Sequence, residues 1–176
     1  MVISDEDFAS IVTEHQATLY RIAFNFFLRN DVAEEVVQDV FLQCFENLKT
    51  IESRAHLKAW LRRAVTHRCI DVVRSGTAKK EIQFAELPDV RGSFLDSDPL
   101  LSERLRRLIS SLPEQQRMIV ILRYGEDMDS NEIGEILSIP ASTVRSYLQR
   151  ALVTLREKAY RALGDEFYGH VRKQSS

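Results

Sequence analysis

Residues 129–155 read DSNEIGEILSIPASTVRSYLQRALVTL, and their pattern predicts two short helices joined by a tight turn. Asp129 can cap the first helix, and Glu132, three residues later, can complete a capping box. Apolar residues at helical spacing follow, so we predict the first helix over residues 130–137.

Pro140 separates the two helices. The residue before a proline avoids helical geometry, whereas proline itself suits the first turn of a helix. The second helix is therefore expected to begin near Ala141 or Ser142. Together the two helices form a helix-turn-helix, a motif that many DNA-reading domains share.

The second helix has the side chains that DNA contact requires. Its predicted buried stripe comprises Val144, Leu148, Ala151, Leu152 and Leu155. Its predicted DNA-binding side comprises Ser142, Thr143, Arg145, Ser146, Gln149 and Arg150. Hydroxyl groups at a helix N-terminus and arginines further along suit phosphates and base edges. An ordinary helical hairpin remains the alternative for this stretch alone.

The charge distribution favours DNA over the plain hairpin. Residues 139–163 contain five basic side chains and one acidic side chain, although the whole chain has 24 basic and 26 acidic residues. A local basic surface on a mildly acidic protein indicates a defined contact surface.

The composition predicts an all-α protein without a membrane segment. The chain has 176 residues, 44% of them hydrophobic, with only six glycines and four prolines and no sustained two-residue alternation. No apolar run approaches the ~18 residues that cross a bilayer, and the N-terminal MVISDEDF is acidic rather than basic and apolar. We therefore expect a cytoplasmic protein. Cys44 and Cys69 lack metal-ligand spacing and are expected to be buried free thiols.

The first 75 residues predict a bundle of three helices. In the second helix, Asp31 is expected to be the N-cap, and Phe45 belongs to the predicted buried stripe. Its opposite side is polar and comprises Glu34, Glu35, Gln38, Asp39 and Gln43. A solvated helix face is the simplest interpretation of that side. The third helix, from near Ser53 to about Arg74, has six basic residues and one acidic residue. An acidic helix and a basic helix in one unit suit a protein partner and nucleic acid, respectively.

The rest of the chain predicts a linker and a second bundle. Periodicity fades over residues 76–98, which we interpret as a flexible linker between domains at 1–75 and 99–164. Residues 118–122 are apolar nearly all round a helix and should lie at the centre of the second domain. Gly164 is expected to end the last helix, with residues 165–176 as a loose tail.

Four stretches, in this order, resemble the extracytoplasmic-function group of bacterial RNA polymerase sigma factors. They are LYRIAFNFFLRNDVAEEVVQDVFLQCF at 19–45, AWLRRAVTHRCIDVVRS at 59–75, LISSLPEQQRMIVILRYGEDMDSNEIGEIL at 108–137 and IPASTVRSYLQRALVTLRE at 139–157. The resemblance covers most of the chain. It implies partners in core RNA polymerase, promoter DNA and an anti-sigma protein.

The resemblance also implies a role for each face. The second helix would bind the clamp helices of the largest polymerase subunit through Asp31, Glu34, Glu35, Gln38 and Asp39. The third helix would read and open the minus-ten promoter element, with Arg62, Arg63, Thr66, His67 and Arg68 as candidates. The helix-turn-helix would read the minus-thirty-five element in the major groove.

Some residues depart from the usual pattern of the family. His67 stands where asparagine is common, and Ser138 and Ser142 replace frequent glycines. Tyr147 and Leu152 stand where many members have arginine. These departures affect the expected promoter sequence and affinity, not the class.

The sequence also bears on two other classes of function. A free-standing helix-turn-helix regulator, with an N-terminal sensing or dimerisation bundle, is the main alternative and predicts operator binding by the protein alone. An enzyme is not expected, because the sequence lacks G-x-x-x-x-G-K-[ST], G-x-G-x-x-G and H-E-x-x-H. We therefore expect no cofactor, no metal and no small-molecule substrate.

Overall fold

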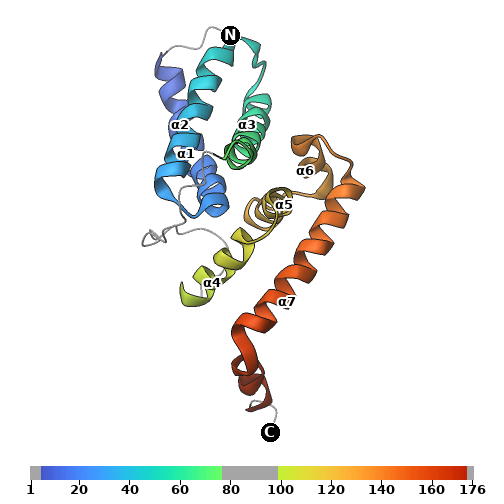
Figure 1. The fold of residues 1–176 in the computed structure, drawn as a ribbon. Helices are drawn as coiled ribbons and strands as arrows, with labels where there is room; N and C mark the ends of the chain where they lie inside the picture. The colour runs from blue at the N-terminus through green and yellow to red at the C-terminus, as the bar shows by residue number, and fades with distance from the viewer. Residues whose placement is uncertain (1–4, 77–98, 174–176) are drawn as a thin grey trace.

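The structure of the protein is a computed structural model that describes residues 5–76 and 99–173 (Figure 1). All regular secondary structure in these two segments is helical, which confirms the predicted all-α class. The predicted linker lies almost entirely outside the described residues. No helix within the described segments is long and apolar enough to cross a membrane.

Three helices form the N-terminal bundle. They are α1 (Asp5–Phe27), α2 (Asn30–Asn47) and α3 (Arg54–Arg74), with a short 3₁₀ helix, η1 (Leu48–Thr50), between the last two. The Ser53 hydroxyl accepts a hydrogen bond from the His56 backbone N–H at 3.1 Å and caps α3, which begins near Ser53 as predicted. The predicted cap of α2 is wrong. Arg29 is its N-cap, and Asp31 lies in the first turn, where its carboxylate accepts from Arg29 Nε at 3.0 Å.

Four helices form the C-terminal domain. They are α4 (Pro99–Ser110), α5 (Glu114–Gly125), α6 (Ser130–Leu137) and α7 (Ala141–Lys173). Residues 118–122 of α5 are all buried, as their apolar pattern predicts. The predicted helix end at Gly164 is wrong, because α7 continues through it to Lys173.

Two side chains that the stripes predict to be buried are exposed. Phe45 on α2 is 53% exposed, and Leu152 on α7 is 39% exposed. Both stand at the margin of an apolar stripe, where helical spacing alone does not distinguish the core from the surface. The predicted burial of Cys44 and Cys69 as free thiols is confirmed.

The two bundles pack against each other. Helix α5 lies against α1, and α6 lies against α3 (Figure 1). The buried side chains of both bundles form one connected cluster. Between α5 and α1, the Arg117 guanidinium lies 4.8 Å from the Phe26 ring centroid and donates to the Phe26 carbonyl at 3.1 Å. This packing determines which candidate side chains are accessible.

Candidate nucleic-acid and polymerase interfaces

The first helix of the helix-turn-helix begins with a complete capping box. Asp129 Oδ1 accepts from the backbone N–H of Asn131 at 2.7 Å and of Glu132 at 2.9 Å. In return, the Asp129 N–H donates to Glu132 Oε2 at 2.8 Å. The capping box satisfies N–H groups that a helix start otherwise leaves without a partner. Both helix starts of the motif agree with the prediction.

The turn between α6 and α7 is close-packed. Ser138 has φ 57° and ψ 42°, the left-handed geometry that glycine adopts most easily. The Ile139 N–H donates to the Gly134 carbonyl at 3.0 Å, and a Cβ at Gly134 would lie only 2.7 Å from the Ile139 oxygen. The turn therefore requires glycine at 134, whereas a serine is accommodated at 138.

The proposed DNA-reading side of α7 faces solvent. Val144, Ala151 and Leu155 are buried and fix the rotation of the helix. Of the six DNA-binding candidates on α7, only Thr143 is half-buried, and the other five are exposed. The Arg150 guanidinium lies 6.0 Å from the ring centroid of Tyr147. The structure thus presents cations and hydroxyls together on an open helix face.

Part of the candidate side of α3 contacts the C-terminal domain. Arg63 Nη2 donates to Ser138 Oγ at 2.6 Å, and His67 Nε2 lies 2.8 Å from the Ile136 carbonyl oxygen. Thr66 is fully buried, and its Oγ1 has no hydrogen-bond partner within the described structure. Arg63 and His67 thus contact the other domain, although the Arg63 side chain is itself exposed.

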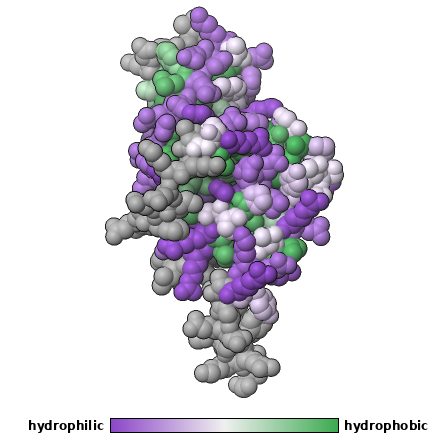
Figure 2. Space-filling model, viewed as in Figure 1, coloured by the Kyte–Doolittle hydropathy of each residue, from purple (hydrophilic) through white to green (hydrophobic). Residues whose placement is uncertain are grey.

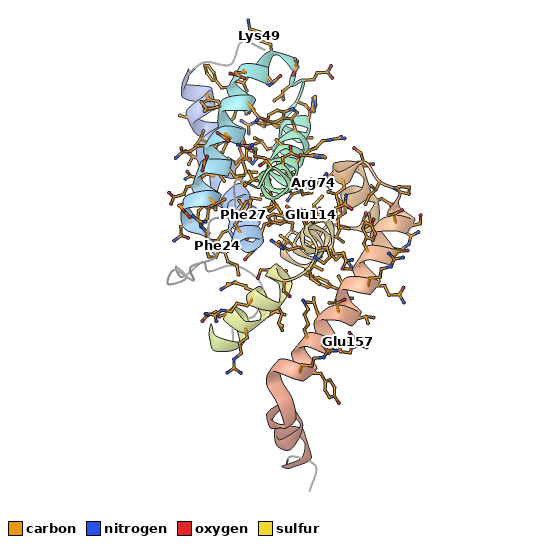
Figure 3. The ribbon with its side chains drawn as sticks, viewed as in Figure 1. Phe24, Phe27, Lys49, Arg74, Glu114 and Glu157 are labelled. Carbon is orange, nitrogen blue, oxygen red and sulfur yellow. The ribbon has the colours of Figure 1, made fainter. Side chains whose placement is uncertain are left out.

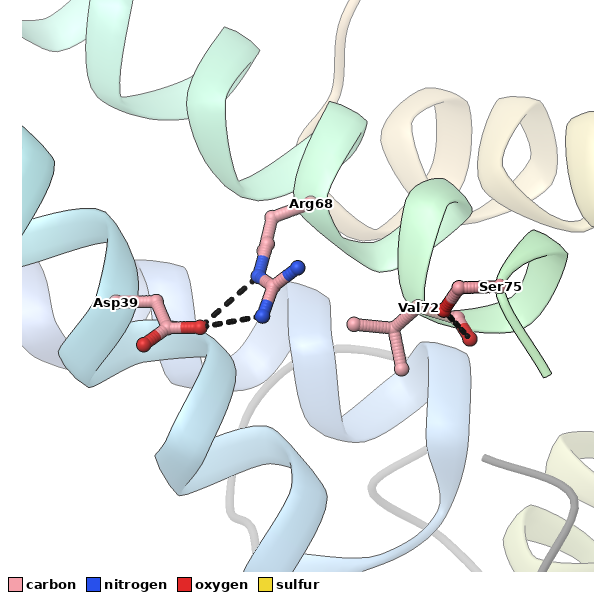
Figure 4. Close-up of polar contacts among 4 residues, drawn as sticks. All are labelled: Asp39, Arg68, Val72 and Ser75. Carbon is pink, nitrogen blue, oxygen red and sulfur yellow. Dashed lines mark hydrogen bonds and ion pairs between the residues drawn. The ribbon is translucent and has the colours of Figure 1, made fainter. Parts of the chain in front are cut away.

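Arg68 instead joins α3 to α2 (Figure 4). Its Nε and Nη2 atoms both donate to Asp39 Oδ2, at 2.9 and 2.6 Å. The resemblance assigns these two residues to different interfaces, and their separation of 29 positions gives no local signal of contact. The other acidic candidates on α2, Glu34 and Glu35, are exposed, as is Gln38.

Two apolar side chains extend the exposed side of α2. Leu42 is 64% exposed, and the Phe45 ring packs on Phe8 with 5.1 Å between centroids. Leu42 was not among the predicted site residues, although its place four residues after Gln38 puts it on the polar side of the helix. Figure 2 shows that the visible surface is otherwise largely hydrophilic, with hydrophobic side chains in small separate patches.

A buried carboxylate crosses the boundary between the two domains. The Glu126 side chain, only 3% exposed, accepts from Arg21 Nε at 2.9 Å and lies 3.7 Å from Arg62 Nη2. Neither Arg21 nor Glu126 was predicted, because the pair is 105 positions apart. We call the contact formed by Arg21, Arg62, Arg63 and His67 with Glu126, Ile136 and Ser138 the interdomain seam.

A weaker ion pair lies outside the seam. Arg74 at the end of α3 and Glu114 at the start of α5 lie side by side, 3.4 Å apart (Figure 3). Both side chains are partly exposed, so the pair adds little stability. Burial lowers the pKa of the neighbouring Arg117, an effect that the Glu114 carboxylate opposes. Arg74 and Arg117 thus add to the arginines of the seam at the boundary between the two domains.

Comparison with known proteins identifies the class. Residues 11–79 match the family model described as Sigma-70 region 2, and residues 102–155 match Sigma-70, region 4. The chain is 27% identical over 172 residues to the ECF RNA polymerase sigma factor SigW of Bacillus subtilis, covering 88% of this chain and 90% of that protein. It is 28% identical over 148 residues to the RNA polymerase sigma factor SigV of the same organism, covering 82% and 86%.

Solved structures share the fold. The sigma factor RpoE of Bartonella quintana, solved with the anti-sigma factor NepR, has a TM-score of 0.67 at 20% identity and covers 86% of this chain and 96% of that one. CnrH, solved with the cytosolic domain of CnrY, has a TM-score of 0.63 at 20% identity and covers 88% of both chains.

The protein belongs to the sigma-70 family of RNA polymerase sigma factors. Within that family it is an extracytoplasmic-function sigma factor, as the resemblance indicated. It therefore binds core RNA polymerase and directs transcription initiation at promoters.

Proposed function

We propose that three surfaces of this sigma factor have separate roles. The exposed side of α2 binds the clamp helices of the largest polymerase subunit, the candidate side of α3 opens the minus-ten element, and the start of α7 reads the minus-thirty-five element. The observation that carries the proposal is the open cationic side of α7 on a chain whose net charge is −2.

The α7 assignment rests on accessibility and chemistry. Arg145, Gln149 and Arg150 are exposed on successive turns, and the buried residues behind them hold the helix in place. Arginine donates two parallel hydrogen bonds to guanine, and glutamine can pair with adenine. Ser142 and Ser146 can reach phosphate oxygens near the helix start. These properties support a helix that enters the major groove.

The α2 assignment rests on charge and exposed apolar area. Glu34, Glu35 and Gln38 supply a polar rim, and Leu42 and Phe45 supply apolar side chains that no described residue covers fully. Protein interfaces commonly combine an apolar centre with a polar rim. Asp39 contributes indirectly, because Arg68 already occupies its carboxylate.

The α3 assignment requires the side chains that contact the C-terminal domain to be released from it. Arg62, Arg63 and His67 could then hold a single strand, with a base removed from the stack. No chemistry follows that step in the sigma factor itself. We accordingly propose that the protein is not an enzyme and that it acts in the cytoplasm, where polymerase and promoter meet.

We also propose control by an anti-sigma protein. Both solved relatives above are complexes, and NepR, the partner of the Bartonella protein, is an anti-sigma factor. Exposed apolar side chains on α2 and α7, including Leu42 and Val153, provide contact area for such a partner.

Run-off transcription tests the proposal. Purified protein and bacterial core polymerase are combined with the DNA upstream of the protein's own gene. We expect a discrete transcript that requires both components. A specific gel shift by the protein alone, without any transcript, would instead support a free-standing regulator.

A further inference from the structure

We propose that Tyr147 is a positioning residue for promoter recognition, whose ring holds the Arg150 guanidinium in the orientation that reads a guanine. This inference rests on the proposed role of α7 at the minus-thirty-five element. It extends that role to a side chain outside the predicted DNA-binding set, and it gives the two arginines of the α7 surface different properties.

The ring and the guanidinium are neighbours on one edge of α7. Arg150 follows Tyr147 by three positions, a spacing that brings side chains together on a helix surface. The guanidinium carbon lies over the Tyr147 ring at 6.0 Å from its centroid, within the distance of about 6 Å at which an aromatic face attracts a cation. Arg145 has no aromatic residue three or four positions away in the sequence, so on α7 this support is specific to Arg150.

The Tyr147 ring is a fixed platform. It is half-buried and packs against the hydrophobic core, whereas Arg150 is exposed. A long arginine side chain loses rotamer freedom when it binds DNA. Contact with a fixed ring restricts that freedom before the DNA arrives, and such preorganisation improves affinity.

The ring leaves the charge of Arg150 available. One turn before and after it, α7 has Ser146, Tyr147, Val153 and Thr154. None of these is acidic. A carboxylate would hold the guanidinium more strongly, but it would also offset the positive charge and repel phosphates. Arg68 illustrates that alternative, because the Asp39 carboxylate already accepts two of its hydrogen bonds. A neutral aromatic partner therefore suits an arginine that binds DNA.

An oriented guanidinium favours a base over a phosphate. The planar group can donate two parallel hydrogen bonds to N7 and O6 of guanine in the major groove, and both depend on its orientation. Phosphate can also be bound by a mobile point charge such as an ammonium group. Positioning by Tyr147 should therefore increase discrimination at one base pair more than the overall attraction to DNA.

NMR of the free, full-length protein tests the contact itself. The Tyr147 ring should shift the protons of the Arg150 side chain upfield. Tyr147→Leu, and independently Tyr147→Met, should remove that shift, whereas Tyr147→Phe should retain it. Thermal unfolding checks that the variants fold. Arg150 shifts that are equal in the parent and in the variants without a ring would overturn the contact.

Affinity of the reconstituted holoenzyme for promoter DNA tests the function of the contact. The DNA is the promoter that run-off transcription identifies, with each base pair of its minus-thirty-five element replaced in turn. Tyr147→Leu should weaken binding to the unaltered promoter about three-fold, the size expected for an exposed cation–π contact. The loss should disappear at the one base-pair replacement that also abolishes the effect of Arg150→Ala.

Double variants and a matched control isolate the role of the ring. In an Arg150→Ala background, Tyr147→Leu should cause no further loss, because Tyr147 acts through Arg150. Tyr147→Phe should match the parent, as should Tyr124→Leu, the same change at an exposed tyrosine of α5. A loss that persists without Arg150, that is equal at every altered promoter, or that Tyr147→Phe reproduces would overturn positioning by the ring.

These outcomes are separable from a failure of the sigma-factor function. If no transcript requires both the protein and polymerase, the proposed function fails and this inference fails with it. If the transcript persists and Tyr147→Leu holoenzyme binds every promoter as the parent does, only the role of Tyr147 fails.

Discussion

Arg68 of α3 and Asp39 of α2 form a two-pronged hydrogen-bonded ion pair, at 2.6 and 2.9 Å, which joins the helix proposed to bind DNA to the helix proposed to bind polymerase. Each side chain is about one-third exposed, at 36% for Arg68 and 34% for Asp39. The pair positions the two helices relative to each other, so neither residue is simply a free contact for a partner.

Removal of this pair should lower the stability of the N-terminal bundle. Asp39→Ala is expected to reduce the free energy of unfolding by about 0.5–1 kcal/mol, the range for partly exposed ion pairs. Denaturant unfolding measures the change. Glu35→Ala, on the same helix, is the control and should alter stability very little. Equal losses in Asp39→Ala, in Arg68→Ala and in the double variant would identify the pair as the source.

Promoter reading and polymerase binding should be separable. Arg145→Ala is expected to weaken recognition of the minus-thirty-five element by about 1–3 kcal/mol, because a direct base contact is worth that much, while affinity for polymerase stays unchanged. Transcription from promoters altered at that element, together with a polymerase binding assay, measures both effects.

Glu35→Lys should have the opposite effect. Charge reversal on α2 should reduce affinity for core polymerase while leaving the α7 surface intact. Glu14→Lys makes the same charge change on an exposed part of α1 and serves as the control. If Arg145→Ala and Glu35→Lys lowered polymerase affinity equally, the assignment of separate faces would be wrong.

Gly134→Ala should destabilise the helix-turn-helix. The added methyl group would lie 2.7 Å from the Ile139 carbonyl oxygen, so the turn must shift, at a cost of about 1–3 kcal/mol. Thermal unfolding measures the loss. Glu135→Ala, at the exposed next position of α6, should leave the melting temperature nearly unchanged. A Gly134→Ala protein as stable as the parent would show that the turn adapts without cost.

Alkaline pH should destabilise the protein through its cysteines. Burial raises the pKa of Cys44 from 9.0 to about 11 and raises that of Cys69 still further. The folded state therefore keeps its thiol protons at a pH where the unfolded chain loses them. Stability is complete below pH 9 and falls as the pH rises from 9 towards 11, by up to about 1.4 kcal/mol per pH unit for each thiol.

Unfolding in denaturant across this pH range measures the slope. Cys44→Ala should reduce the slope, whatever it does to stability at neutral pH. A thiol reagent at pH 8 should react slowly with the folded protein, because both sulfurs are buried. Rapid modification of both cysteines would contradict the burial of their sulfur atoms.

Local signals predicted the helix-turn-helix accurately. Asp129 and Glu132 determine the start of α6 through contacts within four residues, and Pro140 determines where α7 begins. Such contacts depend only on neighbouring side chains, so the sequence pattern contains nearly all the information. The predicted N-cap of α2 was wrong by two positions, because Arg29 rather than Asp31 is the N-cap.

Contacts between distant positions could not be predicted in this way. The pair Arg21 and Glu126 depends on how the two bundles pack, and no periodicity relates α1 to the end of α5. Thr66, a minus-ten candidate through the family resemblance, is fully buried. The candidate residues of α7 were identified as an exposed set because they depend on one helix alone.

Because the first turns of α7 are exposed, the residues proposed to select the promoter can be substituted without disturbing the fold. Arg145, Gln149 and Arg150 project from the helix without filling the core, whereas Val144 and Ala151 anchor it from behind. Outward side chains can therefore be replaced as a set while the fold, the α2 surface and the seam are preserved. A cell that duplicates such a gene could acquire a second regulon through a few surface substitutions, with the original polymerase contacts retained.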